Sequence, residues 1–272
     1  MAIFIFCCGM RRSASTLQYN IVKEILEKSN SGMALGYAES GEIEKLIKKN
    51  KDNNGYFVIK VHDFFPLAEE LLNEGKAKII FSYRDIRDII VSSMYKWNLG
   101  NFDITYNYNY VNILKQSYYK WTTLKDVYSS AYEDIIKDLQ KEVSEICNYL
   151  NIILSKNDIK EIADQVSFEK QKSYLKQNKK FIKTPFGEMD SDTLLHKNHL
   201  RSGKIKQWET ELNKFQIATI QRDWKEWILK NNYNYIYTLY DLPFVYKIIK
   251  KWKYVSSKLL RKFKKVLKRF KN

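Results

Sequence analysis

The residues Gly9-Met-Arg-Arg-Ser-Ala-Ser-Thr16 decide the fold, because an apolar run precedes them and a helical pattern follows them. Residues 2–8 (AIFIFCC) are all apolar, which is typical of a strand buried in a parallel sheet. Apolar residues then recur at helical spacing from Leu17 to Leu26. The chain therefore opens with a strand, a loop and a helix.

The same alternation continues along the chain. The apolar pattern predicts strands at 56–61, 78–83 and, more weakly, 126–132, and helices at 67–72, 86–95 and 139–150. Alternating strands and helices indicate an α/β fold: a three-layer sandwich whose central, mostly parallel sheet is covered on both faces. Two polar stretches interrupt the pattern. Residues 99–110 are expected to form a surface loop, and residues 176–207 a long mobile segment.

The loop 9–16 lies where a doubly wound sheet binds anions, between a strand and the amino end of a helix. Its spacing is that of a nucleotide P-loop, but Ala14 replaces the second Gly and Ser15 replaces the Lys. The missing Lys argues against a loop that holds the γ-phosphate of ATP with magnesium. Arg12 supplies a bidentate cation instead. The alternative is a plain turn with solvated arginines.

A second pattern, Arg84-Asp-Ile-Arg-Asp-Ile-Ile-Val-Ser92, joins a predicted strand to a predicted helix. Arg84 stands at the carboxyl end of that strand, on the sheet edge where ligands bind. Ser92 follows two helical turns later, within reach of the same anion. The alternative is a solvated cluster of Arg and Asp that caps the helix.

Together these two segments resemble the nucleotide-binding elements of the sulfotransferase family. Residues Arg11–Thr16 resemble P-[K/R]-S-G-T-T, and Arg84–Ser92 match R-[D/N]-x-[R/K]-D-x-x-V-S. Three weaker matches follow the order of the family's small-molecule branch: Lys60-Val-His62 (K-x-H), Tyr132-Glu-Asp134 (Y-E-D) and Leu200–Trp208 (R-K-G-x-x-G-x-W). The resemblance covers residues 9–208, most of the chain before the tail.

The resemblance implies transfer of the sulfuryl group of 3′-phosphoadenosine-5′-phosphosulfate (PAPS) to a hydroxyl or amine of a small acceptor. By the resemblance, His62 is the base, with Glu39 as a second candidate, and Lys60 and Arg12 stabilise the transferring group. It also implies a set of cosubstrate-binding residues: Arg11, Arg12, Ser13, Ala14, Ser15, Thr16, Arg84, Ser92, Tyr132, Phe168, Leu200, Arg201, Ser202 and Gly203. No cluster of carboxylates or histidines suggests a metal, so we expect none.

The chain departs from the family pattern at several positions. Leu17 stands where the family often has an aromatic residue, and Phe168 of a Ser-Phe pair is the candidate for the aromatic face toward adenine. Ser202 replaces the Lys of R-K-G, for which Lys204 or Lys206 could compensate. His196 and His199 fall in the polar segment and are expected to be exposed.

The positive charge is concentrated in the C-terminal tail. The net charge is +16, and residues 244–272 hold twelve Lys or Arg and no Asp or Glu. We therefore predict a sulfotransferase domain at 1–243 and a basic amphipathic helix at 244–272, which docks on protein or on an anionic membrane surface. The near-neutral remainder gives no reason to expect a nucleic-acid partner. Without a signal-peptide pattern or an apolar span, a cytoplasmic location is expected.

Two other functions stay open at this point. A P-loop kinase or NTPase would need the Lys that Ser15 replaces and a metal-binding Asp where Arg84 stands. A non-enzymatic, basic membrane-associated module would account for the tail but not for the ordered motifs before it.

Overall fold

A computed structural model describes residues 1–96, 101–177, 180–185, 187–198 and 200–252. The chain divides into two compact units, Met1–Lys206 and the residues from Gln207 onward. The predicted domain boundary at residue 243 stays a prediction, because residues 253–272 of the tail lie outside the described part.

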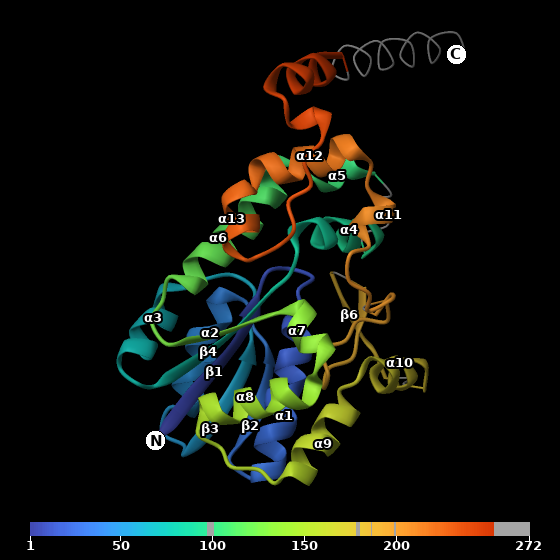
Figure 1. The fold of residues 1–272 in the computed structure, drawn as a ribbon. Coiled ribbons are helices and arrows are strands. Elements are labelled where there is room, and N and C mark those ends of the chain that lie inside the picture. Colours follow the sequence, from blue (N-terminus) through green and yellow to red (C-terminus); the bar gives the residue numbers. More distant parts are fainter. Residues whose placement is uncertain (97–100, 178–179, 186, 199, 253–272) are drawn as a thin grey trace, which may run out of the picture. The chain divides into compact units, whose positions relative to one another are not determined.

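The first unit is built on a five-stranded parallel sheet in the order β2-β3-β1-β4-β5 (Figure 1). The strands are β1 (Ala2–Gly9), β2 (Gly32–Tyr37), β3 (Gly55–Lys60), β4 (Ala77–Tyr83) and β5 (Val127–Ala131). Four of the five were predicted from the apolar pattern. The exception is β2, whose sequence GMALGY has two glycines and no continuous apolar run.

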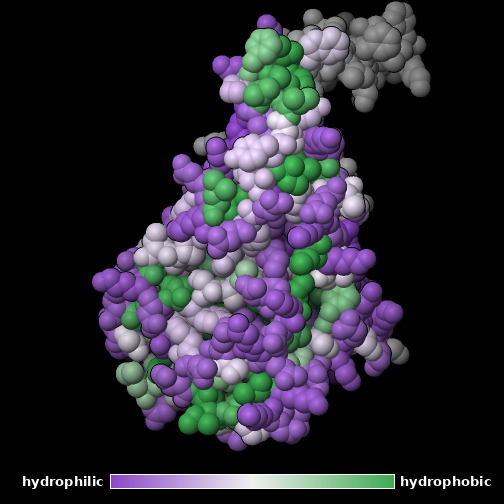
Figure 2. Space-filling model, viewed as in Figure 1, coloured by the Kyte–Doolittle hydropathy of each residue, from purple (hydrophilic) through white to green (hydrophobic). Residues whose placement is uncertain are grey.

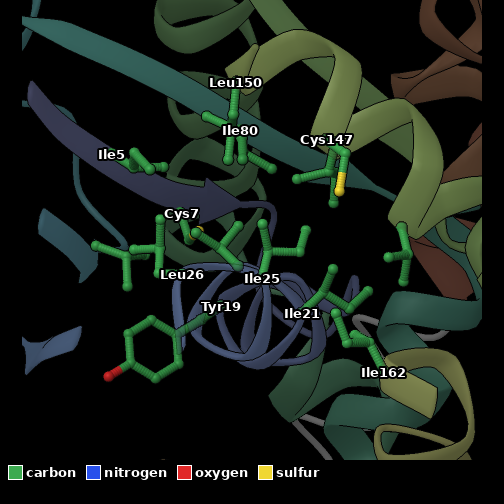
Figure 3. Packing of buried hydrophobic residues seen from close by; sticks show 14 of the residues in the cluster. Ile5, Cys7, Tyr19, Ile21, Ile25, Leu26, Ile80, Cys147, Leu150 and Ile162 are labelled. Atoms are coloured by element: carbon green, nitrogen blue, oxygen red, sulfur yellow. The ribbon is translucent and has the colours of Figure 1, made fainter. Parts of the chain in front are cut away.

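One face of the sheet is covered by α1 (Ser15–Ser29), α8 (Leu139–Leu150) and α9 (Lys156–Gln165). Figure 3 shows this packing, with side chains of β1 and β4 meeting those of the three helices. The residues labelled there are Ile5, Cys7, Tyr19, Ile21, Ile25, Leu26, Ile80, Cys147, Leu150 and Ile162.

The opposite face is covered by α3 (Pro66–Asn73) and α6 (Tyr108–Thr122). The ring of Phe6 meets that of Phe65 edge-on at 5.0 Å, and Phe81 meets Tyr118 at 6.0 Å. Successive residues of β1 thus bury side chains on both faces, which explains its continuous apolar sequence. The predicted three-layer α/β sandwich is confirmed.

The polar stretches hold more regular structure than their composition indicates. The prediction of a surface loop at 99–110 is wrong for the described residues 101–110. They contain α5 (Phe102–Thr105) and the start of α6, and Phe102 and Tyr110 are buried. The remaining elements of this unit are α2 (Ser40–Asn50), α4 (Ile86–Lys96), α7 (Tyr132–Lys137), α10 (Phe168–Gln177) and the antiparallel hairpin β6 (Ile182–Thr184) and β7 (Gly187–Met189).

The second unit comprises α11 (Trp208–Glu211), α12 (Lys214–Asp223), α13 (Lys225–Lys230) and a 3₁₀ turn at Leu239–Asp241. Residues 243–252 are helical, as predicted for the start of the tail. Tyr246 of this helix is buried and stacks on Phe215 at 5.6 Å. Among the described residues, we find no helix with the length and apolar character to cross a membrane.

The core packing generates a stability prediction. Ile25 is completely buried between α1 and the sheet, so Ile25→Ala should lower the free energy of unfolding by about 2–5 kcal/mol. Ile153 is 96% exposed, and Ile153→Ala should change it by less than about 0.5 kcal/mol. Urea denaturation of both variants checks this, and equal losses would contradict the placement of α1 over the sheet.

Candidate nucleotide site

The loop 9–16 leaves the sheet at its topological switch point. From β1, the chain runs through α1 to β2 on one side, whereas β4 leads toward β5 on the other. The carboxyl ends of β1 and β4 therefore frame a crevice, which is where open α/β sheets bind ligands.

The loop is fixed against β4 by the buried side chain of Ser13. Its Oγ lies 2.9 Å from both the carbonyl oxygen and the Oγ of Ser82. A Cβ on Gly9 would stand only 2.4 Å from the same Ser82 Oγ, so the close approach of loop and strand requires glycine there. The Ser13 side chain therefore supports the loop, and ligand contacts fall to its backbone N–H groups and to its neighbours.

Two residues of the loop adopt left-handed backbone conformations without being glycine. Arg12 has φ 68° and Ala14 has φ 80°. The second is the position where the family pattern has Gly, so Ala14 keeps the conformation at a cost of about 1–2 kcal/mol. Ser15 and Thr16 are buried at the start of α1, and Arg11 is half-buried.

Arg12 joins the loop to α4. Its Nε donates a hydrogen bond of 3.0 Å to Ser92 Oγ, which confirms that the two motifs meet in space. Burial is the main cause that lowers the pKa of Arg12 to about 10, and the nearby cations Arg84 and Arg201 lower it further. Several positive charges therefore gather around this loop.

Arg84 is buried at the carboxyl end of β4. Its Nη2 donates to the carbonyl oxygen of Lys204 (2.8 Å) and to Asp88 Oδ2 (3.3 Å), and its guanidinium lies 4.0 Å from the centre of the Tyr132 ring. Its Nε is buried and has no hydrogen-bond partner among the described residues. A buried donor without a partner is costly, which indicates a position prepared for an acceptor.

The described residues of the segment 190–206 (190–198 and 200–206), here named the strap, are anchored on α1 and on α4, where a mobile segment was predicted. On α1, Asp192 pairs with Lys23 at 2.5 Å and Asn20 donates to the carbonyl oxygen of Thr193 at 3.0 Å. On α4, the backbone N–H of Lys206 donates to Asp88 at 2.8 Å. These contacts join residues more than a hundred positions apart, which composition alone does not reveal.

Gly203 of the strap fits closely between two predicted site residues. Tyr132 Oη donates to its carbonyl oxygen at 3.1 Å. A Cβ on Gly203 would lie 3.0 Å from the Phe168 ring, a tight contact, and its φ of 66° is left-handed, so glycine is favoured on both counts. The guanidinium of Arg201 lies 3.9 Å from the centre of the Tyr95 ring on α4.

The remaining predicted residues lie at the edges of this arrangement. Ser202 is half-buried in the strap. Leu200 lines a cavity of about 690 Å³ beside α10, together with Lys172, Phe181 and others. Leu17 packs against the hydrophobic cluster beneath α1.

Lys60 and His62 follow each other at the carboxyl end of β3. The Lys60 Nζ is buried, donates to the Val61 carbonyl oxygen at 3.1 Å and lies 3.4 Å from His62 Nδ1. Burial lowers the pKa of Lys60 to about 8. Burial and the neighbouring cations Lys60, Arg11 and Arg12 hold the pKa of His62 well below its ordinary value, so this imidazole is neutral at neutral pH.

Glu39, the second candidate base, is exposed at the start of α2, where its backbone N–H donates to Glu42 at 3.2 Å. The prediction that His196 is exposed is wrong, because its side chain is half-buried in the strap. Its electrostatic neighbours include Arg12 and Lys96, and burial together with these cations lowers its pKa to about 4. No motif or spacing marks His196 in the sequence, because the fold of the strap alone brings it there.

The second motif also contains a pair that supports the structure. Arg87 and Asp85 form a buried ion pair with several hydrogen bonds, the shortest 2.6 Å between Nη2 and Oδ2. Asp85 also accepts from the backbone N–H of Arg87 at 2.9 Å. Within the residues described, no group of three or more His, Cys, Asp or Glu side chains could hold a metal ion.

A parallel α/β sheet with a cation-lined loop at its switch point defines a binding protein for an anionic nucleotide. The family model of the sulfotransferase domain matches residues 5–232, which is most of the chain. The chain therefore belongs to the sulfotransferase family.

Solved structures of similar fold include mouse sulfotransferase SULT7A1 complexed with PAP (17% identity, 84% of this chain and 83% of that one covered, TM-score 0.58). They also include retinol dehydratase in complex with androsterone and the inactive cofactor PAP (17% identity, 86% and 82% covered, TM-score 0.54). At these identities the likeness concerns the fold.

The buried pair predicts that the second motif is partly structural. Arg87→Leu should leave Asp85 buried and unpaired and lower the free energy of unfolding by about 3–5 kcal/mol. Lys141→Ala, which removes an exposed pair with Glu145, should cost less than about 1 kcal/mol. Denaturant titration compares the two, and an Arg87→Leu protein as stable as Lys141→Ala would contradict this role.

Proposed function

We propose that this protein transfers the sulfuryl group of PAPS to a hydroxyl or amine of a small acceptor. The observation that carries the proposal is the meeting of Arg12, Arg84 and Ser92 under the strap, where the buried Arg84 Nε has no hydrogen-bond partner among the described residues. An anion with phosphate oxygens supplies the acceptor this donor needs. The cosubstrate is also consistent with PAP in the similar solved structures.

The proposed site has two halves. Arg84, Ser92, Arg201 and the strap would hold the 3′-phosphate, and Tyr132 and Phe168 would contact the nucleoside. The loop N–H groups with Arg12 and Lys60 would hold the 5′-phosphosulfate, where negative charge develops as the S–O bond breaks. Fixed cations can stabilise that charge, and this chemistry needs no covalent intermediate on the protein.

In the proposed reaction, the acceptor oxygen or nitrogen attacks sulfur in line with the leaving group. A new O–S or N–S bond forms, the S–O bond to the 5′-phosphate breaks, and PAP (adenosine 3′,5′-bisphosphate) leaves. His62 takes the proton of the acceptor, for which its neutral form is suited. Lys60 lies against Nδ1 of this ring in the free protein, and an incoming phosphosulfate would draw its charge away from His62.

The direct test is a panel of hydroxyl- and amine-bearing acceptors incubated with PAPS, in which PAP release and label transfer from sulfur-35 are both followed. Stoichiometric transfer supports the proposal. Magnesium-dependent hydrolysis of ATP without sulfuryl transfer would favour the kinase or NTPase alternative.

The nucleotide half generates a binding prediction. Arg84→Ala removes charge-assisted hydrogen bonds worth about 1.5–3 kcal/mol each and should weaken PAP binding by about tenfold or more. Lys160→Ala, at an exposed cation of α9, should leave the affinity unchanged. Calorimetry measures both, and an unchanged affinity in Arg84→Ala would remove Arg84 from the 3′-phosphate site.

The catalytic half generates a second prediction. His62→Gln should bind PAP like the wild type but lose transfer by about 10²-fold or more. Because the pKa of His62 is lowered, the neutral base persists in acid, and the wild-type rate should not fall between pH 7 and pH 6 through this group. Steady-state rates over this range measure both effects. Near-normal turnover in the variant would move the base to another residue, with Glu39 tested next.

We also propose that the tail binds an anionic membrane surface. In the described helix 243–252, Phe244 and Trp252 are 75% and 76% exposed, while no acidic residue stands in 244–272. Hydrophobic side chains gather on this part of the surface (Figure 2). Exposed aromatic residues beside many cations fit a membrane interface, where each basic residue adds about 1 kcal/mol.

Removal of residues 253–272, together with Trp252→Ser, should abolish sedimentation with vesicles that contain phosphatidylserine. Binding to neutral phosphatidylcholine vesicles should be weak for both proteins, and PAP affinity should not change. Tyr246, which is packed in the second unit, is retained so that the fold is preserved. Loss of PAP binding or of folding in the truncated protein would show that the tail belongs to the enzyme core.

A further inference from the structure

His196 is held in place by a closed turn of the strap. The backbone N–H of Asp190 donates to the Leu195 carbonyl oxygen (2.9 Å), and that of Leu194 donates back to the Asp190 carbonyl oxygen (3.0 Å). The buried Asp190 carboxylate accepts from Thr193 N–H at 2.8 Å. His196 follows this turn directly and pairs with Met189 of β7 in an antiparallel bridge. Its backbone position is therefore fixed.

The anchors of the strap lie on either side of His196. Before it, Thr193 accepts from Asn20 of α1, and after it, Asn198 accepts from Lys96 of α4. The same two helices flank the phosphate loop, since α1 begins at its end and Arg12 reaches Ser92 of α4. The strap thus holds His196 between an anchor on α1 and an anchor on α4, and Arg12 of the phosphate loop is among its electrostatic neighbours.

The charged groups around this imidazole are mainly cations. Lys96 of α4 and Arg12 of the loop both lower its pKa, and His196 in turn contributes to the low pKa of His62 at the end of β3. On β7, the backbone of Glu188 acts in the opposite direction and raises the pKa of this imidazole. The neighbouring Lys197 turns away and pairs with the Glu188 carboxylate at 3.0 Å.

We propose that His196 is a phosphosulfate-binding residue, whose imidazole takes up a proton as the nucleotide binds and donates it in a hydrogen bond to a phosphate or sulfonate oxygen. This inference rests on the proposed PAPS cosubstrate and adds a residue that the family motifs do not contain. A bound anion between Arg12, Lys96 and His196 reverses the local field, which favours the charged imidazole.

The proposal gives His62 and His196 different protonation states when the nucleotide is bound. His62 has to stay neutral to accept a proton from the acceptor, whereas His196 becomes charged on nucleotide binding. Lys60 and Lys96 have pKa values of about 8 and are mostly charged below pH 7. PAP affinity should therefore rise as the pH falls from about 7 to about 6, and binding should be accompanied by proton uptake that depends on His196.

The test is calorimetric titration of the full-length protein with PAP at pH 6.5 in two buffers of different ionisation enthalpy. The variants are His196→Ala and His196→Gln, with Lys197→Ala as a matched control beside it. His196→Ala should bind PAP about tenfold more weakly, the loss of one charge-assisted hydrogen bond, and should lose the proton uptake seen in the wild type. His196→Gln should recover part of the affinity without the uptake, and the Lys197→Ala control should behave like the wild type.

Wild-type affinity and wild-type proton uptake in both His196 variants would overturn the proposal. An equal loss of affinity in Lys197→Ala would also overturn it, because the effect would then belong to the strap as a whole. If His196→Ala does not fold, His196→Gln decides between these outcomes. A wild-type protein that binds no PAP would refute the proposed function and this inference with it, whereas PAP binding that needs Arg84 but not His196 would refute this inference alone.

Discussion

The burial of cations at the carboxyl edge of the sheet is the constraint on which the rest of the structure depends. Lys60 ends β3, Arg84 directly follows β4, and Arg12 stands in the loop after β1. Burial is the main cause that lowers the pKa of Lys60 to about 8 and that of Arg12 to about 10. Arg11 lowers the pKa of Lys60 further, and Arg84 and Arg201 lower that of Arg12. These charges are unfavourable in the free protein, so a polyanion that binds among them should stabilise the fold.

The surrounding elements hold the cations in place without neutralising them completely. Asp88 contacts Arg84 at 3.3 Å, the Tyr132 ring lies against the same guanidinium, and the strap donates a backbone N–H to Asp88. Asp85 forms a buried ion pair with Arg87 and does not neutralise Arg84. The acidic residues of the second motif therefore position α4 and the strap, while the buried Nε of Arg84 has no hydrogen-bond partner in the part of the chain that the structure describes. Preorganised donors of this kind cost nothing to reorient when charge develops.

Much of this site could be predicted from the sequence, because the contacts are carried by local patterns. Continuous apolar runs identified β1, β3 and β4, and the spacing from Arg84 to Ser92 follows from the helical repeat of α4. The motif residues Arg12 and Ser92 do meet, as the resemblance implied. The strands and the motif spacing depend on residues that are close in the sequence. The meeting of the two motifs follows because the carboxyl ends of parallel strands lie at one edge of the sheet.

The features that were not predicted depend on contacts between distant residues. The strand β2 has no apolar run, and the strap is polar because its anchors are ion pairs and hydrogen bonds, such as Lys23 with Asp192. A polar segment is predicted to be mobile unless the residues that bind it are known. The residues that bind the strap lie on α1 and α4, far away in the sequence. His196 was missed for the same reason.

The central claim is that the crevice under the strap recognises a 3′-phosphate in addition to a 5′-anion. Equilibrium binding of PAP and of adenosine 5′-monophosphate, which differ only in the 3′-phosphate, tests it most directly. Two or more charge-assisted hydrogen bonds at about 1.5–3 kcal/mol each predict that PAP binds at least about 100-fold more tightly. Equal affinities for the two nucleotides would contradict the account.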